Sequence, residues 1–294
     1  MTTVKEKAYA KINLFLDVVE KREDGFHNVK TVMHSVDLFD MISVSVLPSK
    51  MLSVSLKVKN CPYIPSDGRN LASIAAREFC ENLGITASVY IEIDKRIPVS
   101  AGLAGGSTDA AAVLRALNRI YKRPLTFKAL AALGARIGSD VPYCVVGKTA
   151  LCEGRGEIIT PLCSDIELHT VIVSSSERVS TPEAYKALDN EYSDFDGSIP
   201  TGGAEKLAVI TDCIKSGELS DKGMFNIFEQ SVLRTAPKAK GAKQRLLELG
   251  SSFSMMSGSG PSVFGVFPDK ETAASALDAL KNEGYRAFYA KSVC

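Results

Sequence analysis

The residues of this chain that could most directly do chemistry lie in a glycine-rich stretch over residues 98–114. It holds Gly102, Gly105 and Gly106, and Ser107 follows them at the start of a run of small, helix-forming residues. Glycines let backbone N–H groups approach an anion because no Cβ is in the way. A helix N-terminus adds unpaired N–H donors and the positive end of a dipole. The stretch therefore predicts a phosphate-binding loop, and a glycine-rich turn that only allows tight packing is the alternative.

Neither common nucleotide-binding fingerprint describes this loop. No Gly-Lys-Ser/Thr follows the glycines, so it is not a Walker-type P-loop, and no G-x-G-x-x-G supports a Rossmann site. The flanking elements favour phosphate binding nonetheless. An alternating strand with Val89, Ile91 and Ile93 on one face leads into the loop, and an apolar stripe at helical spacing follows it.

The other elements that must position this loop follow from hydrophobic periodicity. Residues 8–19 alternate as a strand, with Lys11 and Asn13 on its polar face. Further strands are predicted over residues 30–36, 41–47, 51–58, 143–151, 158–160, 168–174 and 285–293, and a strand–loop–strand over 253–267. Helices are predicted from Asn70, Ser107 and Thr181, and over residues 126–137, 205–216, 237–249 and 270–283. The polar stretch 190–204 is the best candidate for a mobile loop.

The composition is that of an ordinary globular protein, with 45% hydrophobic and 23% charged residues. The net charge is only +1, so neither nucleic acid nor an anionic membrane is expected as a partner. No apolar run reaches membrane-spanning length and no signal or transit peptide is evident, which predicts a cytoplasmic location. The seven cysteines form no CxxC pair and the three histidines show no ligand spacing, so no metal site built from protein ligands is predicted.

Several segments together resemble one family of small-molecule kinases. The glycine loop is similar to the phosphate-binding signature of the GHMP kinases, named for galacto-, homoserine, mevalonate and phosphomevalonate kinases. Further segments, which occur in the order expected for the family, narrow the resemblance to members that act on a CDP-linked methylerythritol. These segments are Ala10–Asn13, Asp24–His27, Asp94–Pro98, Gly138–Pro142 and Met256–Pro261.

The resemblance implies both a fold and a reaction. The implied fold is α+β, with an N-terminal GHMP kinase domain over residues 1–160, a C-terminal domain over 161–294 and the active site in the cleft between them. The implied reaction is ATP-dependent phosphorylation of a hydroxyl of the CDP-linked alcohol, in the non-mevalonate route to isoprenoid precursors. Magnesium is expected to arrive with ATP, and the enzyme is expected to be a monomer or a weak homodimer.

The resemblance assigns the chemical step to Lys11 and Asp140. An aspartate with an ordinary pKa near ~4 is too weak a base to deprotonate an alcohol beforehand. Asp140 is therefore expected to orient the hydroxyl and to accept its proton as the bond to phosphorus forms. Lys11 is expected to keep Asp140 ionised and to offset charge on the phosphoryl group. A solvent-exposed strand lysine and a helix cap are the respective structural alternatives.

The resemblance also implies which residues bind the acceptor and the donor. Phe26 and Tyr185 would stack on the cytosine ring and His27 would pair with its edge, although turn packing is an alternative for Phe26 and His27. The family often has tyrosine at the position of Phe26, so stacking is kept here and a hydroxyl hydrogen bond is lost. The implied substrate-binding residues are Asn13, Phe26, His27, Thr181 and Tyr185. The implied ATP-binding residues are Gly102, Leu103, Ala104, Gly105, Gly106, Ser107 and Thr108, with Lys95 and Asn70 near the adenosine.

Three questions stay open from the sequence. The segment Asn226–Glu229 resembles a family segment too, but helix packing explains it at least as well. The chain could be another GHMP kinase, acting on homoserine, mevalonate or a sugar. It could also be a kinase-like nucleotide-binding protein without turnover.

Overall fold

The computed structural model describes residues 1–162, 166–177, 179–192, 202–217 and 219–293. The chain forms two compact units, and each is assembled from separate segments. The first unit comprises residues 1–10, 39–99 and 104–147, and the second comprises residues 11–38, 100–103 and 148–294. These units are interleaved along the chain and so do not test the predicted division into domains over residues 1–160 and 161–294. That division stays a prediction. Most of the expected mobile loop, residues 193–201, lies outside the described residues.

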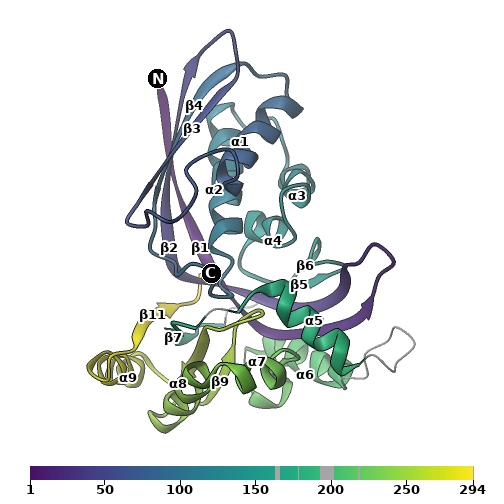
Figure 1. Ribbon diagram of the computed structural model, residues 1–294, viewed down its shortest axis with the longest axis vertical. Helices are drawn as coiled ribbons and strands as arrows, with labels where there is room; N and C mark the ends of the chain where they lie inside the picture. Colours follow the sequence, from purple (N-terminus) through teal and green to yellow (C-terminus); the bar gives the residue numbers. More distant parts are fainter. Residues whose placement is uncertain (163–165, 178, 193–201, 218, 294) are drawn as a thin grey trace. The chain divides into compact units, whose positions relative to one another are not determined.

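The first unit combines strands with a group of helices (Figure 1). Strand β3 (Ser53–Lys59) pairs in parallel with β4 (Ala87–Asp94), and β4 pairs antiparallel with the second part of β2 (His27–Pro48), next to β1 (Thr2–Lys21). The helices α1 (Leu71–Asn82), α2 (Gly105–Ile120), α3 (Phe127–Ala135) and α4 (Val141–Val146) gather on one side of these strands. Alanines buried on both α1 and α2 let these two helices pack closely.

Several predicted elements differ from those of the structure. The strand predicted over residues 143–151 is wrong in its first part, because Val141–Val146 forms helix α4. Pro142 lies in the first turn of α4, where a missing N–H breaks no hydrogen bond, and Gly147 ends the helix at φ 72°. Helix α2 begins at Gly105 rather than at Ser107, and the residue before it, Ala104, adopts a left-handed conformation. The strands predicted over 30–36 and 41–47 are one continuous strand, β2.

The second unit contains the remaining parts of β1 and β2. There β8 (Phe225–Asn226) pairs in parallel with β1, β5 (Thr149–Glu153) pairs antiparallel with β2, and β6 (Ile158–Pro161) pairs with β5. An antiparallel sheet of four strands runs in the order β11 (Arg286–Lys291), β7 (His169–Ser174), β10 (Val263–Phe267) and β9 (Phe253–Met256). Helices α8 (Pro237–Glu248) and α9 (Lys270–Asn282) pack on this sheet, as Figure 1 shows. The other helices of the unit are α5 (Thr181–Glu191), α6 (Gly203–Ser216), α7 (Glu229–Thr235) and the short 3-10 turn η1 (Asp221–Gly223).

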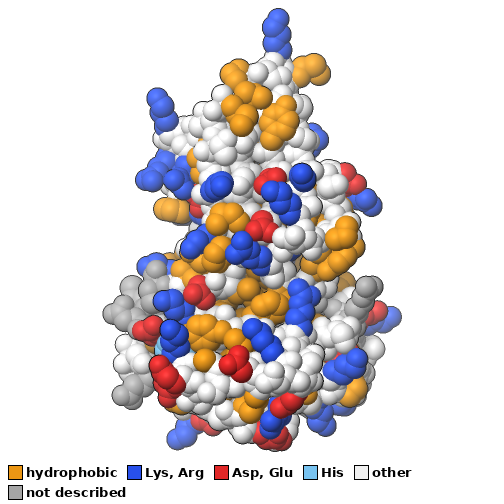
Figure 2. Space-filling model, turned by 90° about the vertical axis from the view of Figure 1, so that its left-hand side faces the viewer, with side chains coloured by type: hydrophobic (Ala, Val, Ile, Leu, Met, Phe, Trp, Pro, Cys, Tyr) orange, Lys and Arg blue, Asp and Glu red, His pale blue; other side chains and the backbone are white. Residues whose placement is uncertain are grey.

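The surface carries mixed charge. On the face that Figure 2 shows, basic and acidic side chains are interspersed, in keeping with the net charge of +1. Among the helices of the described residues, none is both long and apolar enough to cross a membrane.

A buried histidine gives the second unit a pH-dependent stability. His34 on β2 is hydrogen-bonded through Nδ1 to Thr149 Oγ1 (2.8 Å) and through Nε2 to Ser292 Oγ (2.8 Å). Burial lowers the pKa of His34 from 6.5 to about 4. A depressed folded-state pKa contributes stability that is present above pH 6.5 and is lost as the pH falls towards 4.

We therefore expect acidification from pH 7 to pH 4 to lower the unfolding free energy by about 3 kcal/mol through His34 alone. Urea unfolding at several pH values measures the total dependence, and His34→Gln serves as the reference because it does not titrate. If the wild type and His34→Gln lose the same free energy over this range, the burial of a neutral His34 does not govern acid stability.

Candidate active site

Lys11 is held by a chain of buried side chains on β1 and β2. Its Nζ donates to Asn13 Oδ1 (2.6 Å), and Asn13 Nδ2 donates to Thr31 Oγ1 (2.8 Å). Thr31 Oγ1 in turn donates to the carbonyl of Phe15 (2.6 Å). Lys11 is only 4% exposed, so the alternative of a solvent-exposed strand lysine is wrong. The predicted polar face of β1 is buried as well, and these hydrogen bonds orient the ammonium group.

Two glycine-rich segments meet beside Lys11. Ser257 Oγ, in the turn after β9, donates to the carbonyl of Gly102 (3.0 Å). A Cβ at Gly102 would lie 2.0 Å from Ser257 O, and a Cβ at Gly258 would lie 3.2 Å from Lys11 Nζ. Gly102 and Gly258 both have positive φ, so both the conformation and the close approach require glycine. The first glycine of the predicted loop, the turn Met256–Pro261 and a buried cation thus form one cluster in the second unit.

The later part of the glycine loop begins α2 in the first unit, above a buried ion-pair cluster. A Cβ at Gly105 would lie 3.0 Å from Lys95 Nζ. Lys95 Nζ donates to Asp40 Oδ2 (2.5 Å) and to Asp109 Oδ2 (2.8 Å). Asp40 Oδ1 also accepts from the backbone N–H of Ile97 (2.8 Å), which fixes the segment that leads into the loop. Lys95 lies next to the loop, but its ammonium already binds two carboxylates. Its contact with adenosine stays a prediction.

The pKa values of Asp109 and Lys95, in the cluster under α2, are shifted from their usual values. Burial raises the pKa of Asp109 well above its usual value, against the attraction of Lys95. Burial also disfavours the charged form of Lys95, but the carboxylates of Asp109 and Asp40 outweigh it and raise the pKa of Lys95. A charged lysine is therefore stable in this interior position, and it screens the two carboxylates from each other.

Three further predicted residues make structural contacts. Thr108 is buried and donates through Oγ1 to the carbonyl of Tyr9 (2.7 Å). Asn70 precedes α1, accepts from Ala72 N–H (2.9 Å) and so caps that helix. Thr181 begins α5 and shares a hydrogen bond with Ser259 Oγ (2.8 Å), which ties this helix to the Met256–Pro261 turn. Their contacts with ATP or with the acceptor stay predictions.

Asp140 lies directly before α4 in the first unit. Its backbone is helical (φ −84°, ψ −14°), and its side chain makes no capping hydrogen bond to α4. Asp140 therefore stands at the start of α4, as the structural alternative has it, but its side chain does not cap the helix. The carboxylate keeps its acceptor capacity for a hydroxyl group.

An aromatic cluster in the second unit contains the residues predicted to bind a base. The ring of His27 lies 4.7 Å from that of Tyr185 at 32°, and Tyr185 packs edge-on against Phe228 (4.8 Å). Phe26 is 51% exposed, and the guanidinium of Arg155 lies 4.9 Å from its ring. The structure thus brings His27 and Tyr185 together and leaves the ring of Phe26 accessible for stacking.

Sequence reasoning missed the carboxylate behind His27. His27 Nε2 is hydrogen-bonded to Asp189 Oδ1 (2.6 Å), and Lys21 Nζ donates to Asp189 Oδ2 (2.6 Å). Burial opposes ionisation of Asp189, but the hydrogen bonds from Lys21 and His27 lower its pKa. Asp189 is one turn after Tyr185 on α5, so the i, i+4 spacing of the two residues was a usable signal. Arg155 had no comparable local signal.

Comparisons with known proteins identify the family of this chain. Residues 70–148 match the N-terminal domain of the GHMP kinases, and residues 211–286 match their C-terminal domain. Two relatives are named 4-diphosphocytidyl-2-C-methyl-D-erythritol kinase. That of Clostridium kluyveri is 41% identical over 289 residues, which cover 98% of this chain and 99% of the relative. That of Clostridium tetani is 40% identical over 294 residues, which cover 99% and 100%. This chain belongs to the GHMP kinase family.

Solved structures show the same fold. A crystal structure of 4-(cytidine 5'-diphospho)-2C-methyl-D-erythritol kinase superimposes with a TM-score of 0.79 at 32% identity, covering 99% of this chain and 100% of the other. Homoserine kinase from Cytophaga hutchinsonii superimposes with a TM-score of 0.75 at 19% identity, covering 100% and 95%, a likeness that concerns the fold alone. The expected α+β GHMP kinase fold is confirmed.

Proposed function

We propose that this protein transfers the γ-phosphoryl group of ATP to a hydroxyl of 4-diphosphocytidyl-2-C-methyl-D-erythritol, in the non-mevalonate route to isoprenoid precursors. The observation that carries the proposal is the buried ammonium of Lys11, held by Asn13 and approached by the Gly258 turn, which itself contacts Gly102. The near full-length similarity to two kinases of that name supports the choice of substrate.

The chemical step forms one bond and breaks one. The acceptor hydroxyl oxygen bonds to the γ-phosphorus of ATP, the bond from that phosphorus to the β,γ-bridging oxygen breaks, and ADP leaves. We propose that Asp140 accepts the hydroxyl proton as the new bond forms, because a carboxylate can only accept it once the oxygen is bonding to phosphorus. Lys11 offsets the negative charge on the transferred group, and backbone N–H groups of residues 102–107 hold the phosphates.

The residues at the start of α2 fit a magnesium ion that accompanies ATP. Magnesium prefers oxygen ligands and is usually held by one or two carboxylates and the substrate phosphates. Asp109 Oδ1 is buried, with no hydrogen-bond partner among the described residues, and Ser107 lies in the same helical turn. We propose that Asp109 and Ser107 hold the ion, which would neutralise charge on the β- and γ-phosphates. In the described parts of the chain, three or more His, Cys, Asp or Glu side chains do not gather anywhere into a metal-binding group.

The aromatic cluster favours the CDP-linked acceptor over the acceptors of other GHMP kinases. Homoserine, mevalonate and galactose have no pyrimidine, so the rings of His27, Tyr185 and the exposed Phe26 would have no base to stack on in those acceptors. We further propose that the enzyme works in the cytoplasm, as a monomer or a weak homodimer.

An ADP-release assay tests the proposed function. The purified protein is supplied with Mg²⁺, ATP and, in separate reactions, the CDP-linked alcohol, mevalonate, homoserine and galactose. We expect release only with the CDP-linked alcohol. Turnover of another acceptor would point to a different GHMP kinase, and ATP binding without release would indicate a protein without turnover.

We expect His27→Ala to raise the KM for the CDP-linked alcohol by roughly 30-fold, while kcat changes by less than about threefold. The variant loses the ring that packs against Tyr185 and the hydrogen-bond partner of Asp189. The proposed role of His27 is to bind the base and not to contact a reacting atom. Steady-state kinetics at saturating ATP measure both parameters. His169→Ala is the matched control, because it also removes a histidine that packs on a tyrosine, Tyr289. Equal changes in KM and kcat would contradict a role confined to holding the base.

A further inference from the structure

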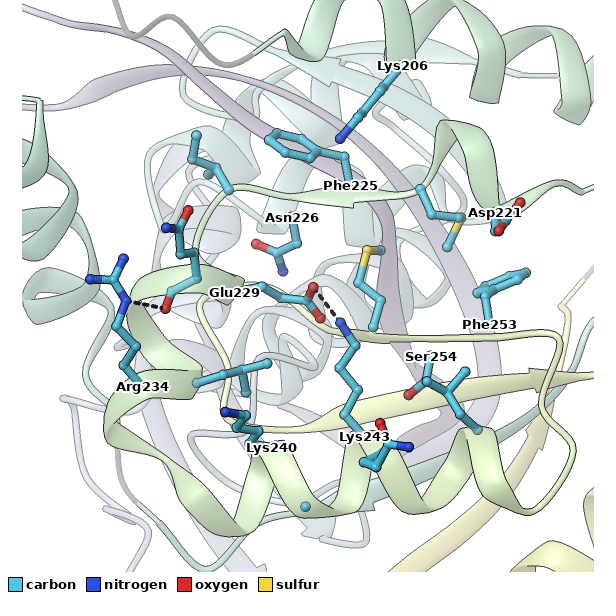
Figure 3. A pocket seen from close by; sticks show the side chains of 18 of the residues that line it. Lys206, Asp221, Phe225, Asn226, Glu229, Arg234, Lys240, Lys243, Phe253 and Ser254 are labelled. Carbon is cyan, nitrogen blue, oxygen red and sulfur yellow. Dashed lines mark hydrogen bonds and ion pairs between the residues drawn. The ribbon is translucent and has the colours of Figure 1, made fainter.

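The segment whose role the sequence left open, Asn226–Glu229, forms one wall of a pocket in the second unit. The pocket has a volume of about 1070 Å³ and is lined by residues of β8, α7, α8 and β9. Figure 3 shows Asn226 and Glu229 side by side at its centre, with Lys243 of α8 extending towards the carboxylate of Glu229. Asn226 and Glu229 also both bind the Met256–Pro261 turn.

Asn226 uses the NH2 part of its amide group to hold that turn, and its amide oxygen binds within its own segment. Its Nδ2 donates to the carbonyls of Met256 (2.8 Å) and Gly258 (2.9 Å), and its Oδ1 accepts from Phe228 N–H (3.0 Å). A side-chain amide offers two donors and an acceptor on one rigid plane, which an aspartate of the same shape cannot provide. Asn226 also lies on β8, in register with Leu16 of β1, the strand that carries Lys11.

Glu229 holds the first residue of the same turn. Its Oε1 accepts from Met256 N–H (2.8 Å), and its Oε2 accepts from Lys243 Nζ (2.8 Å). The side chains of Glu229 and Lys243 are 20% and 27% exposed, so this ion pair is largely shielded from water. The carboxylate thus connects α8 to the turn.

We propose that Asn226 and Glu229 are positioning residues of the active site, which hold the Met256–Pro261 turn against Gly102 and Lys11. The catalytic consequence of this positioning rests on the proposed function. Helix packing alone does not account for two polar side chains of one segment that both bond to the backbone of one turn. That turn presents Ser257 to Gly102 and Gly258 to Lys11, so a displaced turn shifts both the phosphate loop and the cation.

Three variants separate positioning from general stability. Glu229→Ala removes the acceptor for Met256 N–H, and we expect kcat to fall by roughly 10- to 100-fold with the KM for the CDP-linked alcohol within about threefold of wild type. Glu229→Gln keeps an acceptor oxygen, and we expect it to retain kcat within about threefold. Arg234→Ala is the matched control, because Arg234 lines the same pocket and pairs with Glu191 (3.1 Å), not with the turn. It should behave as wild type.

A second readout does not depend on turnover. Hydrogen exchange of residues 253–262, followed by mass spectrometry, should be roughly tenfold faster in Glu229→Ala than in wild type or Arg234→Ala. Should Glu229→Ala fail to fold, Lys243→Met removes only the second anchor of Glu229, and it should still accelerate this exchange. If Glu229→Ala exchanges faster but the wild type releases no ADP, the proposed function is refuted and the anchoring role is kept. Unchanged exchange, or equal losses of kcat in Glu229→Gln and Glu229→Ala, would overturn the positioning role.

Discussion

Asp140→Asn should lower kcat for phosphoryl transfer by about 100- to 10,000-fold and leave the affinity for ATP within about twofold. Asparagine has the size of aspartate and can still hydrogen-bond a hydroxyl, but it cannot take up the proton that the oxygen loses on bonding to phosphorus. The side chain of Asp140 does not cap α4, so the fold should tolerate the change. Steady-state ADP release and calorimetric ATP binding, each at saturating Mg²⁺, measure the two quantities.

Asp212→Asn is the matched control for this experiment. The side chain of Asp212 is 80% exposed, and it forms a long ion pair with Lys215 (3.9 Å) on the same helix. The substitution removes the same charge from the surface and should not change kcat. Turnover by Asp140→Asn within about threefold of wild type would remove Asp140 from the proton transfer.

Lys95→Met should lower the free energy of unfolding at pH 7 by about 3–5 kcal/mol, the largest stability effect that we expect. Methionine fills a similar length but leaves the carboxylates of Asp40 and Asp109 buried without their cation. Urea unfolding followed by circular dichroism measures the change. Lys59→Met is the control, because the Lys59–Glu92 pair (2.6 Å) is about half exposed and should contribute about 0–1 kcal/mol.

The loss in Lys95→Met should also depend on pH. The pKa of Asp109 is already raised by burial, and removal of Lys95 should raise it further. A carboxyl group whose pKa is raised by folding stabilises the fold at pH values below its usual pKa of 3.8. This contribution is lost as the pH rises through the folded-state pKa. The defect should therefore be smaller at pH 4 than at pH 7. A loss below about 1 kcal/mol at pH 7 would show that the two carboxylates do not require Lys95.

The sequence alone was sufficient for the local features of this protein. Alternation over residues 8–19 and helical spacing after the glycine loop predicted β1 and α2, because apolar periodicity reflects which side of an element is buried. The glycine loop by itself indicated phosphate binding, and the resemblance assigned phosphoryl transfer to Lys11 and Asp140. The fold that the resemblance implied is the one found. The strand predicted over 143–151 failed because Pro142 and Gly147 set the limits of a short helix within an apolar run.

The tertiary structure decided which partners each of these residues has. The approach of Gly102 to Ser257, the carboxylate of Asp189 behind His27 and the contacts of Asn226 with the Met256–Pro261 turn join residues far apart in the chain. Periodicity contains no information about such contacts, because it reports burial along one element and not what lies opposite it. Lys95, which the resemblance placed near the adenosine, lies at the centre of a buried ion-pair cluster that no local pattern indicated. The sequence by itself determined which chemical groups are available, whereas long-range packing determined which of them meet, because only folding brings distant backbone and side chains within hydrogen-bonding distance.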